Sequence, residues 1–277
     1  MSNIPDLSLV IAVYNHAEVL RLVLAAVGRQ SFGNFEVIVA DDGSGPPVRE
    51  VVEEAKNLYG YPVTHLWHED SGWRKNTMLN KAIRASKSDY LVFIDGDCLP
   101  ERNFLADHWN ERESGRILLG RRVEMSERWA NGLTIGKIRN GRFERIRLPE
   151  LLDGVKGKAL RLEDGVRIRN KFLRRLSLRK AGRILGSNFS LHKNDIAAIN
   201  GFDEGYDGPG HGEDSDVQYR LSLIGVTGKS LRNLAIQYHV YHSRTTPSEN
   251  SLRRFEEVRK SSDPRCKAGL DRIGNAG

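Results

Sequence analysis

The chain has few of the features that mark a membrane-spanning or disulfide-linked protein. Its 277 residues contain no apolar run of the roughly eighteen residues that a membrane helix needs. The opening residues, MSNIPDLSLVIAVYNH, lack the basic start and cleavable apolar region of a secretory signal. The two cysteines, Cys98 and Cys266, lie far apart without a CxxC partner, which fits a reducing compartment and argues against a structural zinc site. We therefore expect a cytoplasmic protein that does not cross a bilayer.

Positive charge is spread unevenly along the chain. Residues 121–183 alone carry a larger surplus of Lys and Arg over Asp and Glu than the whole chain, whose formal net charge is +7. Such a basic segment is typical of proteins that bind nucleic acid, phospholipid headgroups or a phosphate-bearing substrate. A solvated helical surface explains a charge run equally well. The composition therefore leaves the partner of this segment open.

Short apolar segments alternate with amphipathic ones in the first hundred residues. Residues 7–14 and 35–40 are rich in Val and Ile, and residues 18–29 between them repeat apolar positions at helical spacing. This pattern is typical of a βαβ unit with a parallel sheet. Further strands are predicted near 62–67 and 90–94, with helices at 48–58 and 75–86. The alternation predicts an α/β fold with a mostly parallel central sheet flanked by helices.

The second half of the chain is less regular. Residues 121–183 show no strand period, and we interpret them as a basic, largely helical insertion. Its segment 166–176 has the apolar spacing of an amphipathic helix, which would pack on its own domain or dock on an acidic membrane. Beyond the insertion, strands are predicted at 184–191 and 234–241, and helices at 193–199 and 216–224. The tail, 247–277, is polar.

Carboxylates follow two of the predicted strands. Asp95 and Asp97 flank a glycine directly after the buried strand at 90–94, where two oxygen ligands can face one divalent cation. Asp41 and Asp42 close the strand at 35–40 and can accept hydrogen bonds from a base or a ribose. Ligands of open α/β sheets bind at the carboxyl ends of the strands, so both pairs are placed in one crevice. Each motif alone is also compatible with an ordinary acidic turn.

A glycine-rich loop comes before clustered ionisable residues at residues 208–216. Carboxylates at the start of a helix are stabilised by the helix dipole and can serve as caps. Several ionisable groups on a mobile backbone are also what a general base on a closing loop requires. The residues in question are Gly208, Gly210, His211, Gly212, Glu213, Asp214 and Asp216.

Histidines follow the last predicted strand. His239 and His242 lie in the segment YHVYHSR, and histidine at a strand end is more often structural than a metal ligand. A neutral imidazole can nevertheless complete a divalent site already held by carboxylates. The sequence thus offers His242 as a further ligand beside the acidic residues.

Together these segments resemble the family 2 glycosyltransferases of GT-A fold. The stretch SLVIAVYNHAEVLRLVLAAVGRQSFGNFEVIVADDGSG is similar to their opening βαβ unit, and FIDGD to their DxD site. The stretch AINGFDEGYDGPGHGEDSDVQYRLSLIGVTGK followed by YHSR resembles the carboxyl half of β-1,4-galactosyltransferases and bacterial chondroitin-type polymerase domains. The tryptophan of that pattern is missing, with Pro209 and His211 in its stretch, and residues 121–183 lie outside the resemblance. The resemblance implies one GT-A domain over 1–262, with a nucleotide-sugar half (1–118), the insertion (119–183) and an acceptor half (184–246).

The resemblance also implies roles for single residues. Asp97 and His242, with Asp95, would hold Mn²⁺ or Mg²⁺, and Asp95 would also contact the donor. Asp42, with Asp41, would contact the uridine, and Arg74 and Asn76 would support the nucleotide. Asp214 would be the catalytic base, with Glu213 beside it.

The implied reaction is inverting transfer of galactose, N-acetylgalactosamine or a related hexose from a UDP-sugar to a hydroxyl of a glycan or lipid-linked glycan. The implied setting is bacterial surface polysaccharide synthesis, at the inner face of the membrane if residues 121–183 contact anionic lipid. A sugar-phosphate nucleotidyltransferase is an alternative, but Val13-Tyr14-Asn15-His16 is not the glycine- and arginine-rich loop that such enzymes carry. A non-catalytic protein that binds membrane or nucleic acid would explain the basic segment but leave the ordered carboxylates without a purpose, and we do not expect nucleic acid as a partner.

Overall fold

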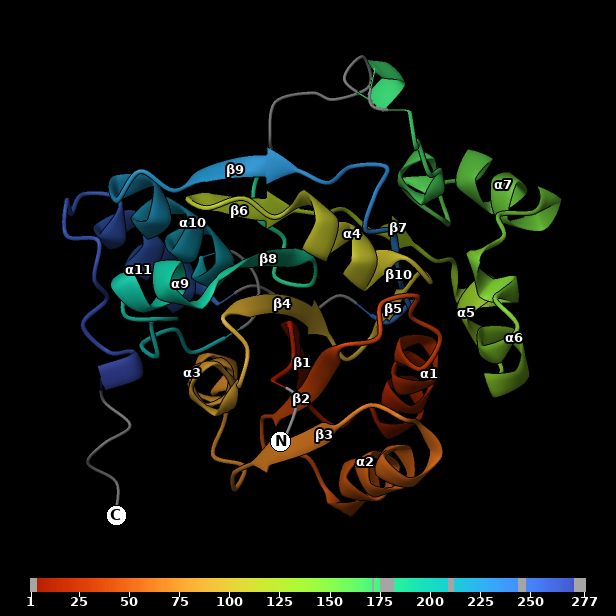
Figure 1. Cartoon of the computed structure of the whole chain (residues 1–277), viewed down its shortest axis with the longest axis horizontal. Coiled ribbons are helices and arrows are strands. Elements are labelled where there is room, and N and C mark those ends of the chain that lie inside the picture. Colours follow the sequence, from red (N-terminus) through yellow and green to blue (C-terminus); the bar gives the residue numbers. More distant parts are fainter. Residues whose placement is uncertain (1–3, 171, 175–181, 209–211, 244–247, 272–277) are drawn as a thin grey trace.

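A seven-stranded sheet runs through the molecule in a computed structural model that describes residues 4–170, 172–174, 182–208, 212–243 and 248–271 (Figure 1). The strand order is β3-β2-β1-β4-β8-β6-β9. All neighbours pair in parallel except β8, which is antiparallel to both β4 and β6. The strands are β1 (Leu7–Val13), β2 (Phe35–Asp41), β3 (Val63–Trp67), β4 (Tyr90–Asp95), β6 (Arg116–Leu119), β8 (Phe189–His192) and β9 (Thr227–Ser230).

Helices cover both faces of this sheet. Leu9, Val37 and Val92 pack on one face against α1 (Ala17–Val27), α2 (Pro46–Leu58) and α4 (Phe104–Glu111). Val10, Ile38 and Phe93 pack on the other against α3 (Lys75–Ala85), α9 (Lys193–Ala198) and α10 (Glu213–Leu223). Because both faces are buried, the central strands are continuously apolar rather than alternating. The predicted α/β fold with a mostly parallel, helix-flanked sheet is confirmed.

A second, three-stranded sheet lies beside the first. It has the order β5-β10-β7, in which β10 (Gln237–His239) is antiparallel to β5 (Cys98–Pro100) and parallel to β7 (Val123–Glu124). Its three strands come from the segment after β4, from the start of the predicted insertion and from near the carboxyl end. This small sheet therefore brings the residues after Asp97 next to those around His242.

The predicted basic insertion contains several short helices where it is described, and it also supplies the strand β7. It contains α5 (Glu127–Asn131), α6 (Ile135–Arg139), η1 (Arg142–Glu144), α7 (Leu148–Val155) and η2 (Leu162–Gly165). The helix predicted over 166–176 is wrong for residues 166–170, which are not helical, whereas 172–174 are. Residues 171, 175 and 176 lie outside the described part of the chain. In Figure 1 the helices α5, α6 and α7 project from the side of the molecule that carries the small sheet.

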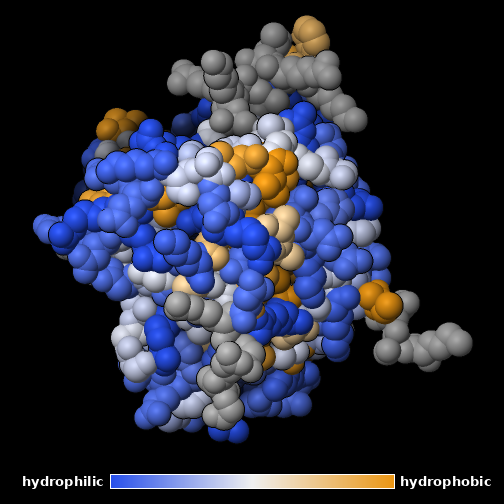
Figure 2. All heavy atoms as spheres, turned by 90° about the vertical axis from the view of Figure 1, so that its left-hand side faces the viewer, coloured by the Kyte–Doolittle hydropathy of each residue, from blue (hydrophilic) through white to orange (hydrophobic). Residues whose placement is uncertain are grey.

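The carboxyl-terminal region is more structured than a polar tail. Residues of the predicted tail form α11 (Glu249–Val258), which packs beside α10. Farther on, the Cys266 and Leu270 amides donate to the carbonyls of Ile199 and Asn200. The strand predicted from 184 begins only at Phe189, and the helix predicted from 216 begins at Glu213. Figure 2 shows that hydrophilic residues cover most of the face formed by α9, α10 and α11, with hydrophobic side chains in a narrow central band. No helix in the described ranges has the length and apolarity to span a membrane.

Candidate functional site

Carboxylates from distant parts of the chain meet at the carboxyl end of β4. Asp95 is the last residue of that strand, and Asp97 follows after a tight turn at Gly96. The Gly96 amide donates to the carbonyl of Ala12 on β1 at 2.7 Å. A Cβ at Gly96 would lie 3.0 Å from the side chain of Val13, so the turn passes close to β1 and favours glycine. The backbone carbonyl of Asp97 in turn accepts from the Val240 amide just after β10.

The side chains of Asp97, His239 and His242 converge on one point. Asp97 Oδ2 lies 3.4 Å from His239 Nε2 and 3.2 Å from His242 Nε2, and the two nitrogens are 3.1 Å apart. His239 ends β10, and His242 lies three residues later. A carboxylate oxygen and two imidazole nitrogens at this spacing form a donor set that suits a divalent transition metal ion.

The outer nitrogens of both imidazoles are already engaged. His239 Nδ1 lies 2.6 Å from a carboxylate oxygen of Glu124, and His242 Nδ1 lies 2.8 Å from the carbonyl oxygen of Ser243. Because both partners are acceptors, each Nδ1 carries a hydrogen. In the neutral imidazoles, the Nε2 atoms that face Asp97 therefore present lone pairs, which is the tautomer of a metal-binding histidine fixed by an outer hydrogen bond.

The electrostatics of this cluster favour a positive charge within it. Burial works to lower the pKa of His239, but Asp97 and Glu124 outweigh it and raise that pKa to about 9. Burial likewise works to raise the pKa of Glu124, yet hydrogen bonds from His239 and Arg122 hold it at about 2. The carboxylates thus create a negative potential, which a divalent cation would neutralise.

Lys75 lies among the acidic residues on the other side of Asp95. Lys75 is the first residue of α3, and its Nζ donates to Asp95 Oδ1 at 2.7 Å. Burial opposes the charge on Lys75, but Asp95, Asp214 and Glu213 raise its pKa above the ordinary value. The ammonium therefore remains charged and stabilises the ionised form of the carboxylates around it.

Asp214 stands at the start of α10, next to the backbone of Gly186. Its Oδ2 accepts a hydrogen bond from the Gly186 amide at 2.7 Å. A Cβ at residue 186 would meet Asp214 Oδ1 at 2.5 Å, so the close approach depends on glycine. Burial raises the pKa of Asp214, while Lys75 lowers it. A partly buried carboxylate with a raised pKa, held in place by one backbone amide, has the properties of a general base.

The neighbours of Asp214 in the predicted loop divide into two groups. Glu213 is buried, its Oε2 has no hydrogen-bond partner among the described residues, and burial together with Asp214 raises its pKa to about 8. Asp216 instead forms an ion pair with Arg220 one turn later on α10, so its carboxylate stabilises that helix and is not part of the cluster. His211, Pro209 and Gly210 lie outside the described residues.

The two aspartates at the end of β2 have different surroundings. Asp41 is fully buried, and it accepts from the Ser44 amide at 2.8 Å and faces His65 Nε2 at 2.9 Å. Asp42 accepts from the Arg74 amide at 2.9 Å and faces His68 Nε2 at the same distance. Burial raises the pKa of Asp42, and these two bonds work against that rise. Both oxygens of Asp42 retain lone pairs that can accept from a nucleoside.

Arg74 and Asn76 were both predicted to support a nucleotide. Arg74 is partly exposed, and its guanidinium donates to the Glu69 carbonyl in the loop after β3. The Asn76 side chain is fully buried and donates to the Asp203 carbonyl at 2.7 Å, which ties α3 to the loop after α9. The structure thus gives Asn76 a bridging contact inside the protein.

Sequence reasoning placed Asp97 and His242 together, and it named Asp95, Glu213 and Asp214. The structure brings all five to one region and adds neighbours that were not chosen. The sequence predicted His242 but not His239 as a ligand, although the two histidines stand three residues apart in the chain. The others are Lys75, which binds Asp95 at the end of β4, and the pair Arg122 and Glu124. The small sheet brings that pair beside His239, and the sequence pattern did not predict that sheet.

Models of known families match most of the chain. Residues 8–166 match the model described as glycosyl transferase family 2. Residues 172–243 match the model described as the N-terminal domain of galactosyltransferase. The first match covers more than half of the chain and includes Asp41, Asp42, Asp95 and Asp97. The second includes Asp214 and His242.

Characterised relatives share part of the chain. Validoxylamine A glucosyltransferase of Streptomyces hygroscopicus subsp. jinggangensis is 28% identical over 244 residues, which cover 81% of this chain and 53% of that protein. Chondroitin synthase of Escherichia coli is 36% identical over 98 residues, 35% of this chain and 14% of that protein. The chain thus spans about half or less of the length of these relatives.

Solved glycosyltransferase structures share the fold. The Staphylococcus aureus TarS 1-349 complex with UDP superposes with a TM-score of 0.60 at 16% identity, covering 96% of this chain and 68% of that one. The mannosyltransferase PcManGT from Pyrobaculum calidifontis, in complex with GDP-Man and Mn²⁺, gives 0.58 at 16% identity, with 88% and 59% covered. The predicted GT-A fold is confirmed by this similarity.

Proposed function

Since the chain belongs to glycosyl transferase family 2, we propose that it is a metal-dependent, inverting enzyme that moves a hexose from a UDP-sugar to a hydroxyl of a glycan. The observation that carries this proposal is the meeting of Asp97, His239 and His242 with Asp214 around the end of β4. A cation site and a general base on one sheet edge are the two elements that transfer from a nucleoside diphosphate requires.

The donor set fits a divalent ion. Asp97, His239 and His242 would hold it, with Asp95 near by, and their imidazole nitrogens favour Mn²⁺ over the oxygen-preferring Mg²⁺. When bound, such an ion neutralises the diphosphate and makes it a better leaving group. Glu124 keeps the imidazole of His239 in the orientation and tautomer that this role needs.

Asp214 is placed to accept the proton of the acceptor hydroxyl. The acceptor oxygen forms a bond to the anomeric carbon, the bond from that carbon to the diphosphate breaks, and its electron pair leaves with the nucleoside diphosphate. The hydroxyl proton passes to a carboxylate oxygen of Asp214. This single displacement inverts the anomeric configuration. Lys75 assists by favouring the ionised form of Asp214 before the transfer.

The nucleoside would bind at the end of β2. Asp42 offers its remaining lone pairs to the uracil or ribose, while Asp41 holds the turn through Ser44 and His65. Arg74, whose amide fixes Asp42, supports the same region. A uridine nucleotide is supported by the likeness to a UDP complex, and the likeness to a GDP-mannose complex makes guanosine the first alternative to test.

The sugar and the acceptor are proposed from the relatives. A galactosyltransferase domain match and similarity to chondroitin synthase support galactose, N-acetylgalactosamine or a related hexose. We propose a glycan or lipid-linked glycan as the acceptor, within bacterial surface polysaccharide synthesis. The free, buried cysteines Cys98 and Cys266 fit a cytoplasmic enzyme, and we propose that the basic segment 121–183 attaches it to the inner face of the membrane.

A donor panel tests the proposal. Uridine, guanosine and thymidine diphosphate sugars are incubated with the protein and Mn²⁺, and nucleotide release is followed with and without EDTA. We expect slow hydrolysis of one uridine donor that EDTA abolishes. Release of pyrophosphate from a sugar phosphate and a nucleoside triphosphate would point to a nucleotidyltransferase instead. Failure to bind or turn over any donor would overturn the proposal and leave a binding protein.

A further inference from the structure

The helix α7 turns its apolar side chains outward. Leu148, Leu151, Leu152 and Val155 are 68%, 48%, 49% and 87% exposed. Their spacing of three, four and seven residues places all four on one stripe of the helix. A helix on the surface of a globular protein normally buries such a stripe, so this one lacks a partner within the described chain.

The opposite side of α7 is polar and buried. Asp153 Oδ2 accepts from the Arg128 guanidinium at 2.9 and 3.1 Å and from the hydroxyl of Ser126. Glu150 Oε2 accepts from the Arg147 amide at 2.9 Å, and its other oxygen lies 3.8 Å from Arg128. Rotating the helix to hide its leucines would break these bonds and leave buried charges unpaired, which is costly. The outward stripe is therefore a fixed feature of the fold.

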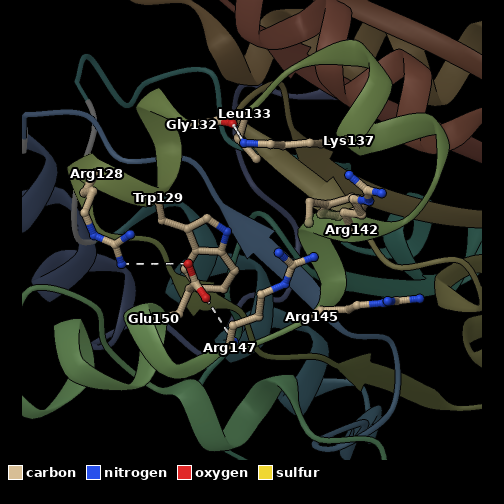
Figure 3. A pocket seen from close by; sticks show the side chains of 10 residues that line it. Arg128, Trp129, Gly132, Leu133, Lys137, Arg142, Arg145, Arg147 and Glu150 are labelled. Carbon is tan, nitrogen blue, oxygen red and sulfur yellow. Dashed lines mark hydrogen bonds and ion pairs between the residues drawn. The ribbon is translucent and has the colours of Figure 1, made fainter.

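Exposed cations come directly before and after α7 in the chain. A pocket of about 150 Å³ lies between α5, α6, η1 and the start of α7, with Trp129 and Phe143 among its walls (Figure 3). Arg142, Arg145 and Arg147 line it, and none of these guanidiniums has a carboxylate partner among the described residues. Lys156 and Lys158 follow the other end of the helix and are exposed. Guanidiniums in a small concave site are suited to phosphate oxygens.

We propose that α7 is an interfacial anchor, which lays its apolar stripe into the headgroup region of an anionic phospholipid bilayer while the adjoining arginines bind lipid phosphates. Apolar side chains along one side of a surface helix, with Arg before it and Lys after it in the chain, suit the headgroup region of an anionic bilayer. The same positive charge would repel a second copy of this face, which disfavours a symmetric dimer. The inference rests on the peripheral membrane contact proposed above and assigns it a surface, in place of the segment 166–176 that the sequence suggested.

Vesicle binding tests this anchor. Wild type is sedimented at low salt with vesicles of phosphatidylcholine alone and with vesicles holding about one third phosphatidylglycerol. We expect at least tenfold stronger binding to the anionic vesicles. The double variant Leu151→Glu/Val155→Glu should lose at least tenfold of that binding, and Arg145→Gln/Arg147→Gln should lose the preference for phosphatidylglycerol. Leu252→Glu, at a comparably exposed leucine on α11, is the matched control and should bind as wild type does.

Three outcomes of the vesicle assay would overturn the anchor. They are no vesicle binding by wild type, equal binding to both vesicle types, or unchanged binding by the α7 variants. A dimer in light scattering that the Leu151→Glu/Val155→Glu variant abolishes, without vesicle binding, would assign the stripe to a second copy and overturn it as well. Thermal unfolding and donor hydrolysis, measured without vesicles, should match wild type in all variants. If wild type turns over no donor but binds vesicles, and the Leu151→Glu/Val155→Glu variant loses that binding, the transferase proposal fails and the anchor stands.

Discussion

The Nε2 atoms of His239 and His242 lie 3.1 Å apart, and both face Oδ2 of Asp97. Each ring donates through its other nitrogen, one to Glu124 and one to the backbone of Ser243. Two lone pairs and a carboxylate oxygen at these distances repel one another unless a proton or a metal ion lies between them. This relationship is the physical basis for placing a cation at the end of β10.

Removing either imidazole should weaken metal binding. We expect His239→Ala and His242→Ala to raise the Mn²⁺ dissociation constant by about tenfold or more, and Glu124→Gln to raise it by about 10- to 100-fold through loss of the outer hydrogen bond. Electron paramagnetic resonance of free Mn²⁺ measures this directly. His192→Ala, at a histidine that packs on Tyr90 away from the cluster, is the control and should leave the constant unchanged. Equal affinity in His239→Ala and wild type would remove His239 from the site.

Substitutions of the two aspartates at the end of β2 should have different effects. Asp41→Asn disturbs two buried contacts, so we expect it to cost about 1–3 kcal/mol of unfolding free energy with little change in donor affinity. Asp42→Asn should instead raise the donor dissociation constant, since Asp42 keeps some exposure to a bound nucleoside whereas Asp41 is fully buried. Thermal unfolding and calorimetric titration with donor and Mn²⁺ give both quantities. The reverse pattern would show that Asp41 contacts the nucleotide.

Loss of the Lys75 charge should alter the pH dependence of transfer. Lys75 lowers the pKa of Asp214, so Lys75→Gln should raise that pKa and move the acidic limb of kcat/KM to higher pH. Activity at pH 6 should therefore fall more than activity at pH 9. Arg84→Gln, an exposed cation on the same helix, is the matched control and should leave the profile in place. If the acidic limb of the pH profile of kcat/KM moves to lower pH in Lys75→Gln, the assignment of Asp214 as the base is contradicted.

Glu213 should act as a neutral group at pH 7. Burial and Asp214 raise its pKa to about 8, so Glu213→Gln resembles the protonated form and should retain most activity below pH 8. A carboxyl whose pKa is raised on folding contributes stability below its ordinary value near 4.5, which is lost as pH rises through 8. Wild type should therefore lose stability relative to Glu213→Gln between about pH 5 and 8, on the order of a few kcal/mol. Loss of activity in Glu213→Gln at pH 7 would instead assign the ionised form to catalysis.

Much of the fold follows from local patterns, because the strands β1, β2 and β4 are buried on both faces and carry continuous apolar runs. The residues that follow them, Asp42 and Asp97, could be placed at one sheet edge on topology alone. The small sheet was not predictable in this way, since two- and three-residue strands such as β5 and β7 carry no periodicity. Glu124 was missed for that reason. The contact of Lys75 with Asp95 joins the start of α3 to the end of β4 and depends on tertiary packing rather than on a local pattern.

The helix α7 shows a further limit of sequence patterns. Its spacing reveals an apolar stripe, but a period does not tell which side of a helix faces the protein. That orientation depends on hydrogen bonds to Asp153 of α7. They are donated by Arg128 of α5 and by Ser126, which precedes α5. The basic charge of this region was visible in the sequence, whereas the surface that uses it was not.

The most direct test of the central claim compares donor binding and sugar transfer in wild type and Asp214→Asn. Asparagine keeps the size of the side chain and an acceptor for the Gly186 amide but cannot take up the hydroxyl proton. With Mn²⁺ and the donor selected from the panel, we predict an unchanged donor dissociation constant and a kcat for transfer that falls by about 10²- to 10⁴-fold. A variant that binds donor equally well and transfers sugar at the wild-type rate would contradict the account.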